Sequence, residues 1–214
     1  MTPDPPVPTW KRQARALVHD AILDAARATF AEHGYAAATV DEIAARAEVS
    51  KGTIYNYVDG GKGGLFVAVL AEHFDELHGL AEVHLGTPGA PFRDRYRAFV
   101  AAVADYFRAN ADLLRVHLRE VPQLLMSDDG EQAERLRVQR DRIEAAVAAP
   151  LAAAIAAGEI RPVPVGPTAH VLLGVLMGFL HTTASPCATT PPPPEAADFL
   201  TALLFDGLET AKEA

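Results

Sequence analysis

The sequence predicts an all-α protein of about nine helices, and three observations carry that prediction. Apolar residues recur at spacings of three and four along most of the chain, which is the period of an amphipathic helix. No stretch keeps for long the alternation of apolar and polar residues that a half-buried strand requires. Capping residues and clusters of Gly or Pro divide the pattern into helix-sized segments.

The helices are expected to follow one another through short connections. In chain order we expect them at residues 11–30, 40–47, 51–57, 62–85, 92–110, 112–125, 131–157, 167–183 and 194–212. Gly34 ends the first helix as a left-handed residue would. Thr39 and Glu42 form a capping box before the second, and Ser50 can cap the third. Gly158 stops the seventh helix, and a proline-rich loop separates the last two.

Negative charge is concentrated in the later part of the chain. The protein has 19 basic and 28 acidic residues, a net charge of −9. Residues 1–64 hold 7 basic and 8 acidic side chains, net −1, whereas residues 65–214 hold 12 and 20, net −8. Lys11, Arg12 and Arg15 cluster near the start. A nearly neutral module with basic edges can meet phosphate while the acidic remainder stays away, so we expect two domains, residues 1–64 and 65–214.

Composition argues against several other classes of protein. The acidic, proline-rich start does not read as a signal peptide, and no apolar stretch reads as a membrane span. A single cysteine, Cys187, excludes an intrachain disulfide and a four-cysteine zinc site. The histidines are scattered and no catalytic set emerges. We expect a cytoplasmic protein that is not an enzyme and uses no metal or cofactor.

Residues 39–57 predict two short helices joined by a turn, a unit that can present its second helix to DNA. Val49 and Ile54 are the apolar residues expected to face the core between the helices. The side chains left outside are almost all polar. Lys51 can reach guanine acceptors or phosphate, and Thr53 offers a methyl group to thymine as well as a hydroxyl.

A wider set of residues at fixed spacings carries a family resemblance. The set comprises Ile22-Leu23-Asp24-Ala25-Ala26, Phe30, Gly34-Tyr35, Thr39-Val40, Ile43-Ala44, Val49-Ser50-Lys51-Gly52-Thr53-Ile54-Tyr55-Asn56-Tyr57, Lys62 and Leu65-Phe66. These residues resemble the DNA-binding part of the TetR family of bacterial transcriptional regulators. The resemblance implies an all-helical fold in two domains. Three N-terminal helices would form a helix-turn-helix DNA-binding domain behind a flexible arm, and the larger remainder would dimerise and hold a small-molecule pocket.

The resemblance also places the expected DNA contacts. The candidate DNA-binding residues are Thr39, Ser50, Lys51, Gly52, Thr53, Tyr55, Asn56, Tyr57 and Lys62. Tyr57 and Thr39 can donate to phosphates, and Gly52 lets the backbone approach the duplex. An N-terminal arm carrying Arg12 and Arg15 can reach the minor groove, or these residues can simply be solvated.

Three departures from the family pattern surround this unit. Glu48 stands where the family usually has glycine, which costs about 1 kcal/mol if that residue needs a positive φ. Val58 replaces a larger phenylalanine. The Gly60-Gly61 connection is one residue longer than usual, and Gly63-Gly64 replace better helix formers, which predicts a looser start to the fourth helix.

The middle helices offer candidates for a ligand pocket. Aromatic, sulfur-containing and basic side chains there could line an apolar cavity, although each could simply be a core residue, which is the better interpretation for the individual aromatics. An Arg or His in such a cavity would favour an anionic or polar-headed ligand. The candidates are Tyr96, Phe99, Phe107, Arg115, His117, Met126, Met177 and His181.

The last two helices predict a homodimer. Residues 171–180 are apolar nearly all round, so that helix must be covered on all sides. Gly174 and Gly178 allow close helix approach. We expect the pair to meet its two-fold copy in a four-helix interface, with an intrachain core as the alternative. The candidate interface residues are Leu172, Val175, Phe179, Phe199 and Leu203.

The leading functional hypothesis is a dimeric transcriptional repressor that binds a double-stranded DNA operator and leaves it when a small-molecule effector binds. A ligand that changes the distance between two recognition helices would alter DNA affinity without touching a base. The alternative is an all-helical small-molecule carrier or enzyme whose DNA-binding domain no longer functions.

Overall fold

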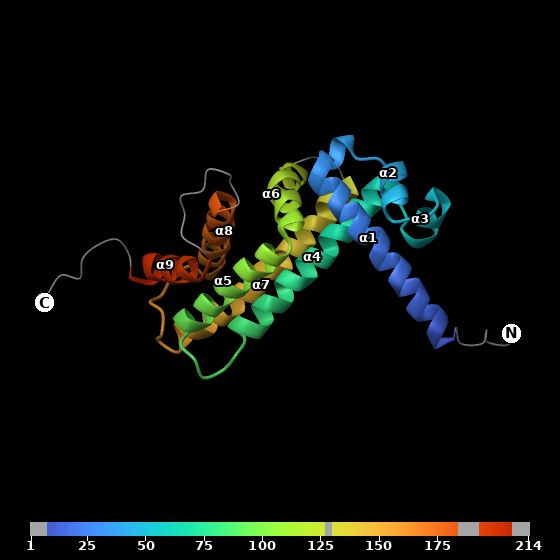
Figure 1. The fold of residues 1–214 in the computed structure, drawn as a ribbon. Coiled ribbons are helices and arrows are strands. Elements are labelled where there is room, and N and C mark those ends of the chain that lie inside the picture. The colour runs from blue at the N-terminus through green and yellow to red at the C-terminus, as the bar shows by residue number, and fades with distance from the viewer. Residues whose placement is uncertain (1–7, 127–129, 184–192, 207–214) are drawn as a thin grey trace, which may run out of the picture. The chain divides into compact units, whose positions relative to one another are not determined.

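The structure, a computed structural model, describes residues 8–126, 130–183 and 193–206. Within these ranges it contains nine helices and no strand (Figure 1). The helices are α1 Thr9–Ala37, α2 Val40–Arg46, α3 Lys51–Tyr57, α4 Gly61–Leu85, α5 Phe92–Ala109, α6 Ala111–Met126, α7 Gly130–Ala156, α8 Val165–Thr183 and α9 Pro193–Asp206. The all-α prediction is therefore confirmed, and none of the described helices has the length and hydropathy to span a bilayer.

The described residues fall into two compact units. The first takes the described residues up to Glu72 and those of Arg115–Leu136, which carry most of α6. The second takes His73–Leu114 and the described residues from Arg137 onward. Both α4 and α7 contribute to each unit.

Aromatic and aliphatic side chains from four helices form the core of the first unit. Phe30 of α1, Ile43 of α2, Ile54 of α3 and Phe66 of α4 are completely buried. The Phe66 ring meets Phe30 edge to face at 5.2 Å between centroids and lies 4.8 Å from the ring of Tyr35. Ile54 is the one buried residue of α3, so this helix places only one of its faces in the core.

The second unit is built around α5, which packs extensively against α9. Tyr96 is completely buried, and its hydroxyl donates to the carbonyl of Leu172 on α8 at 2.9 Å. Two ion pairs, Arg93 with Asp206 and Arg97 with Asp198, join α5 to α9 at the surface. Burial raises the pKa of Tyr96 above its ordinary value, so this phenol stays protonated and serves as a structural donor.

The helix boundaries differ most from the prediction at the two ends of the chain. The first helix begins at Thr9, and helical structure resumes after Gly34 and continues to Ala37. Gly34 breaks the helix as expected, because its φ of 81° and ψ of 164° are not helical. The last helix is described to Asp206, and its expected continuation to residue 212 lies outside the described residues.

Candidate nucleic-acid interface

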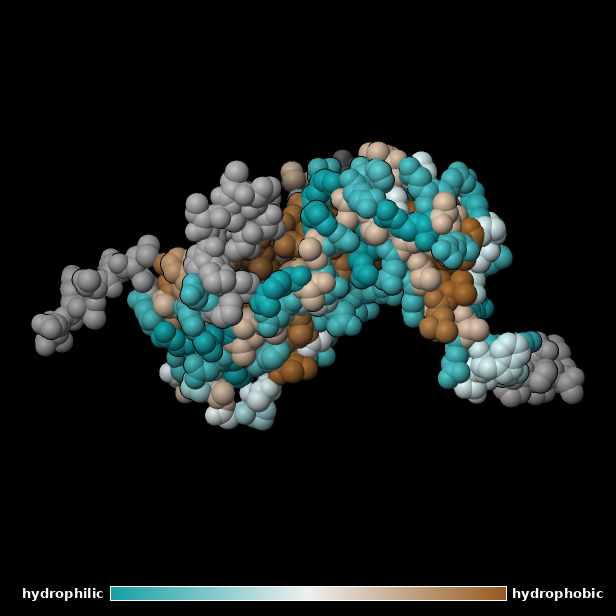
Figure 2. All heavy atoms as spheres, viewed as in Figure 1, coloured by the Kyte–Doolittle hydropathy of each residue, from teal (hydrophilic) through white to brown (hydrophobic). Residues whose placement is uncertain are grey.

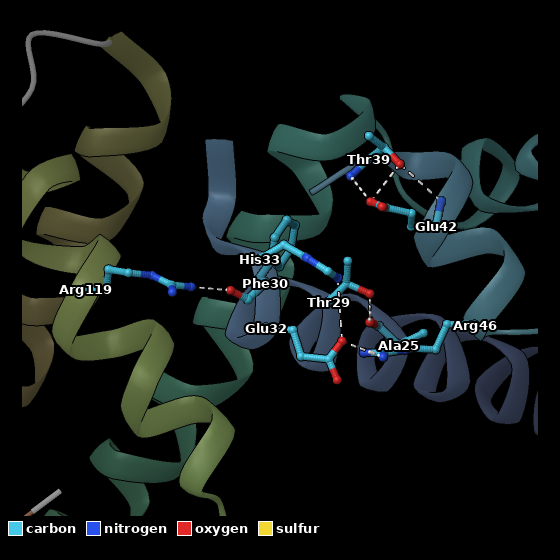
Figure 3. Close-up of polar contacts among 9 residues, drawn as sticks. All are labelled: Ala25, Thr29, Phe30, Glu32, His33, Thr39, Glu42, Arg46 and Arg119. Atoms are coloured by element: carbon cyan, nitrogen blue, oxygen red, sulfur yellow. Dashed lines mark hydrogen bonds and ion pairs between the residues drawn. The ribbon is translucent and has the colours of Figure 1, made fainter. Parts of the chain in front are cut away.

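The capping box at the start of α2 is present in full. The Thr39 hydroxyl accepts a hydrogen bond from the backbone N–H of Glu42 at 3.2 Å. The Glu42 carboxylate in return accepts the backbone N–H of Thr39 at 2.9 Å (Figure 3). The Thr39 hydroxyl also donates to this carboxylate at 2.9 Å, and that bond, followed by the one from the Thr39 backbone, lowers the pKa of Glu42, so the carboxylate stays ionised next to the positive end of the helix. The entry of α2 is thus fixed by local chemistry.

The turn into α3 has the strained geometry that the sequence suggested. Glu48 has a φ of 55°, and it is the one residue other than glycine with a positive φ in the described part of the chain. Ser50 then caps α3, with its hydroxyl accepting the backbone N–H of Thr53 at 3.0 Å. The hydroxyls of Ser50 and Thr53 lie 2.8 Å apart, so each is a partner of the other in the free protein.

The short helix α3 buries one residue and leaves polar groups outside. Ile54 is completely buried, whereas Lys51, Tyr55 and Asn56 are exposed, Tyr55 by 48%. Thr53 and Tyr57 are half-buried. Gly52 is exposed, and a Cβ built there would meet its nearest atom, the Ser50 oxygen, at an ordinary 3.7 Å. The structure thus brings the predicted α3 residues onto one accessible surface of a rigidly seated helix.

Three cations border this surface, each with a neighbour of its own. Lys51 is paired with Asp41 of α2 at 2.9 Å, and that hydrogen bond raises the pKa of the lysine. Lys62 donates to the carbonyl of Ala36 at 3.1 Å and lies over the Tyr35 ring at 4.8 Å. Arg15 lies 5.4 Å above the ring of Tyr57. The last residues of α1 thus hold the Lys62 side chain in the free protein.

Residues distant in sequence hold α1 in place within this unit. Arg119 of α6 donates to the carbonyl of Phe30 (Figure 3). Its neighbour Glu120 accepts the backbone N–H of Tyr35 at 3.0 Å and lies 2.8 Å from the Arg119 Nε. A Cβ at Gly34 would come within 3.3 Å of the Glu120 carboxylate. Sequence reasoning missed this pair, because nothing local to residues 119–120 points to a partner 85 or more residues earlier.

A second tie joins α1 to α2. Arg46, at the last position of α2, donates to the Glu32 carboxylate at 2.7 Å (Figure 3). The Nε2 of His33 lies 3.6 Å from the same carboxylate. These groups are exposed, so their contribution to stability is small, but they restrict how α2 can pivot on α1.

One group of side chains in this unit has the composition of a metal site. His19, Asp20 and Glu72 place one ligand atom each within 4.8 Å of one another. Asp20 and Glu72 are exposed, and desolvation raises the pKa of Glu72, which opposes its ligand form. Exposed acidic side chains commonly lie this close together without an ion, so the cluster by itself does not indicate a metal site.

The candidate ligand residues do not gather around one described cavity. Tyr96, Phe99 and Phe107 are core residues of the second unit, and Met177 is half-buried there. Arg115, His117 and Met126 belong to the first unit, where Met126 is 87% exposed. Desolvation lowers the pKa of His117 to about 4, so it is neutral at pH 7. The side chain of His181 lies outside the described residues.

The second unit does contain a cavity, of about 480 Å³, at residues that the sequence did not single out for a ligand. Its lining comes from α5, the end of α7, α8 and α9 and the connection between α7 and α8: Pro91, Phe92, Arg93, Leu151, Glu159, Ile160, Arg161, Val163, Thr168, Leu172, Leu204 and Phe205. Glu159 accepts the backbone N–H of Phe92 at 2.7 Å and so caps α5. Such mixed, mostly apolar lining is typical of small-molecule sites.

The candidate dimer residues vary in exposure. Phe199 is 52% exposed, whereas Leu172 is buried. Val171, the residue before Leu172, is 53% exposed. Val175, Phe179 and Leu203 are half-buried. Phe179 of α8 and Phe199 of α9 have ring centroids 6.3 Å apart, so the two helices share an apolar surface. A Cβ at Gly174 or Gly178 would meet nothing within 4 Å.

Comparison with known proteins matches two regions of the chain. Residues 22–69 match the family described as bacterial regulatory proteins, tetR family. Residues 89–181 match the C-terminal domain described as tetracyclin repressor-like.

Two curated relatives share part of the sequence. An HTH-type transcriptional repressor of Streptomyces coelicolor is 34% identical over 114 residues, which cover 53% of this chain and 55% of the relative. The HTH-type transcriptional activator FasR of Mycolicibacterium smegmatis is 38% identical over 95 residues, covering 44% of this chain and 42% of FasR. The matched stretches thus span about half the length of these relatives.

Solved structures share the fold over most of the chain. FadR of Bacillus subtilis, solved with stearoyl-CoA, has a TM-score of 0.79 at 19% identity and covers 89% of this chain and 100% of its own. PfmR of Thermus thermophilus has a TM-score of 0.73 at 25% identity and covers 90% of this chain and 97% of its own. With both regions matched in order, and with the capped α2–α3 unit in place, the chain belongs to the TetR family of bacterial regulatory proteins.

Proposed function

We propose that this protein is a sequence-specific DNA-binding transcriptional regulator that acts as a homodimer and responds to a small molecule. The observation that carries the proposal is the surface of α3, where Lys51, Tyr55 and Asn56 are exposed on a helix that is capped at Ser50 and anchored by buried Ile54. A rigid helix with outward polar side chains is the element that enters a major groove.

The side chains divide into two roles under this proposal. Lys51, Thr53 and Tyr55 are the residues that read bases, because they lie on the exposed surface of α3 or at its edge. Thr39, Ser50 and Tyr57 bind phosphates with hydroxyl groups, and the N-termini of α2 and α3 add backbone donors. Gly52 allows the backbone of α3 to approach the duplex, and Asn56 extends the contact. Lys62 binds phosphate with the ammonium N–H groups that do not donate to the Ala36 carbonyl.

Two copies are needed for a specific operator, because a single α3 reads too few base pairs. In a homodimer joined through α8 and α9, two recognition helices would read half-sites roughly 34–36 Å apart or a multiple of that spacing. The apolar surface shared by Phe179 and Phe199 supports this interface, as does the open space beside Gly174 and Gly178. Residues 1–64 then form the DNA-binding domain in the functional sense, and residues 65–214 bind the effector and the second subunit.

The effector is proposed to be a small, mostly apolar molecule. One curated relative is named a repressor and the other an activator. We propose repression for this protein, and the sign of regulation needs its own test. The cavity of about 480 Å³ in the second unit supports this proposal, because its volume falls in the range of small-molecule sites. The structure of FadR from Bacillus subtilis with stearoyl-CoA is an example of the same fold with a bound ligand.

The proposal is tested by selecting duplexes from a random-sequence library with the full chain and measuring their affinity by fluorescence polarisation. Lys51→Ala should relax the preference at one or two base positions by about 1–3 kcal/mol. Tyr57→Phe should weaken binding to every duplex alike, because it removes a phosphate donor but keeps the ring beneath Arg15. Arg108→Ala removes an exposed cation from the second unit and should change neither property.

The outcome also separates the regulator from an all-helical carrier or enzyme. A folded protein that enriches no duplex would refute the proposed function. Equal losses on all sequences for Lys51→Ala and Tyr57→Phe would refute the division between base and phosphate contacts. A reporter gene placed behind the selected sequence then gives the sign of regulation.

A further inference from the structure

We propose that the N-terminal extension of α1, residues 9–17, is a second DNA-binding surface that contacts the phosphate backbone of the duplex beside the segment read by α3. The inference rests on the proposed function and deepens it. It names a partner for a helical segment that precedes the family match at residue 22.

The extension contributes no buried residue to the described protein. Every residue from Thr9 to Leu17 is exposed, and the buried side of α1 begins only at Ile22. Trp10 and Leu17, both large and apolar, are 65% and 71% exposed. Figure 1 shows this end of α1 extending past α2 and α3, and in Figure 2 hydrophilic residues occupy its tip with an apolar stretch behind them. A helix of more than two turns that buries nothing needs another source of stability.

The charges of the extension all have one sign. Lys11, Arg12 and Arg15 are basic, and no acidic residue occurs between Asp4 and Asp20. Spacings of three and four place the side chains of Lys11 and Arg12 next to that of Arg15 on the helix surface. Cations at a helix N-terminus oppose the helix dipole, so this arrangement does not serve α1 itself. It does create a positive surface on a chain whose net charge is −9.

These cations also have no carboxylate partner among the described residues. Lys11 lies 5.5 Å from the ring of Trp10, and Arg12 donates to the Thr9 hydroxyl at 3.5 Å. Lys51, by contrast, is already paired with Asp41. Phosphates would therefore displace no ion pair when they bind the extension, which makes it a favourable place for counterion release.

Arg15 joins the extension to the surface of α3. Its guanidinium lies 5.4 Å above the ring of Tyr57, the last residue of α3 and a proposed phosphate donor. From Lys11 to Arg15 the helix rises about 6 Å, which matches the axial length of roughly two phosphates along one strand. The cations thus continue the proposed contact of Tyr57 along the same backbone, and Trp10 lies at the far end of this row.

The test uses the fact that Trp10 is the single tryptophan of the chain, so tryptophan fluorescence, excited at a wavelength that the tyrosines do not absorb, reports on the extension alone. The probe is the duplex selected by the full chain, with and without ten extra base pairs at each end. We expect this DNA to protect Trp10 from acrylamide quenching, and the longer duplex to protect it more.

The second arm of the test is the salt dependence of binding. The triple variant Lys11→Gln, Arg12→Gln, Arg15→Gln should keep the selected sequence but lower the slope of log K against log salt by about 0.9 for each lost contact. The control triple variant Arg108→Gln, Arg140→Gln, Arg142→Gln changes the net charge equally at exposed sites in the second unit and should leave the slope unchanged.

Each outcome decides the matter. Normal DNA binding with Trp10 fully quenchable, or with an unchanged slope in the extension variant, overturns the inference and leaves the proposed function intact. Protection of Trp10 that appears without DNA as protein concentration rises overturns it in favour of a contact between copies. Failure of the wild-type chain to enrich any duplex counts against the proposed function itself. If the variant misfolds by circular dichroism, Trp10 protection in the wild type still gives the answer.

Discussion

At the scale of single residues, Glu48 adopts a backbone conformation in the turn before α3 that lowers the stability of the protein. Its φ of 55° lies in the left-handed region, where a side chain is unfavourable and glycine is not. Glu48→Gly should therefore stabilise the protein by about 1 kcal/mol in chemical denaturation. Glu48→Ala, which keeps a Cβ, should give no such gain, and equal gains from both would show that the carboxylate rather than the backbone carries the strain.

Asp41 restrains the lysine proposed to read bases. Its carboxylate holds the Lys51 ammonium at 2.9 Å in the free protein, so DNA must compete with it. Asp41→Asn should tighten binding to the selected duplex severalfold at low salt, with a smaller gain at high salt because exposed charges are screened. Asp59→Asn, at another exposed site of the same unit, should give a smaller effect in the same polarisation assay. Weaker binding by Asp41→Asn would mean that the pair positions Lys51 for DNA.

Single-residue patterns of the sequence predicted the local chemistry well and the tertiary partners poorly. The caps at Thr39 and Ser50 are confirmed, because capping depends on residues three positions apart. The partner of Lys51 was not predicted, since Asp41 lies on a different helix and its direction depends on how α2 crosses α3. The DNA contacts of these residues stay predictions.

At the scale of elements, two glycines of α4, Gly64 and Gly79, differ in whether the surrounding structure leaves room for a side chain. A Cβ at Gly64 would lie 1.7 Å from the carbonyl oxygen of Asp59, a backbone atom that cannot move aside cheaply. A Cβ at Gly79 would meet nothing within 4 Å. Gly64→Ala should destabilise the protein by several kcal/mol, whereas Gly79→Ala should stabilise it by roughly 0.5–1 kcal/mol through helix propensity.

Thermal unfolding of the two variants provides the measurement for α4. Both replace glycine by alanine on the same helix, so a common shift in the melting temperature would contradict the assignment of the close approach to Gly64. The sequence had suggested that Gly63-Gly64 merely loosen the start of this helix. The geometry supplies a specific reason for glycine at position 64, which depends on the path of the preceding loop through Gly60 and Gly61, both at positive φ.

The elements themselves were largely predictable because their signals are local. Periodicity and caps placed α2, α3, α5 and α6 within one or two residues of their observed bounds. The first helix was predicted too short mainly at its C-terminal end, because Gly34 was expected to stop it, whereas helical structure resumes after Gly34 and continues to Ala37.

At the scale of the whole molecule, the proposed homodimer allows a test with two matched variants. Phe199 and Val138 are each 52% exposed, on α9 and α7 respectively. Phe199→Asp should raise the dimer dissociation constant at least about a hundredfold, since a buried aromatic anchor would become a charge. Val138→Asp should not. Sedimentation equilibrium at micromolar concentration distinguishes them, and similar behaviour of both variants would place the interface elsewhere.

Long-range assembly was the part that the sequence could not supply. The pairing of Arg119 and Glu120 with the break at Gly34 joins residues 85 or more positions apart, and no periodicity encodes such a contact. The cavity of the second unit likewise draws on α5, α7, α8 and α9, and none of the seven ligand candidates whose side chains are described lines it. Residue type alone cannot distinguish a core aromatic such as Tyr96 from one that lines a cavity.

The continuity of α4 has a practical consequence for anyone dissecting the protein. Glu72 ends one compact unit and His73 begins the other without any interruption of the helix. A fragment cut after residue 64 would lack Phe66, whose ring packs against those of Phe30 and Tyr35. It would also lack the α6 groups that hydrogen-bond the end of α1. Such a fragment would expose its aromatic core to water. A folded fragment of the proposed DNA-binding unit would therefore have to keep α4 through Glu72 and also include the α6 groups that bond the end of α1.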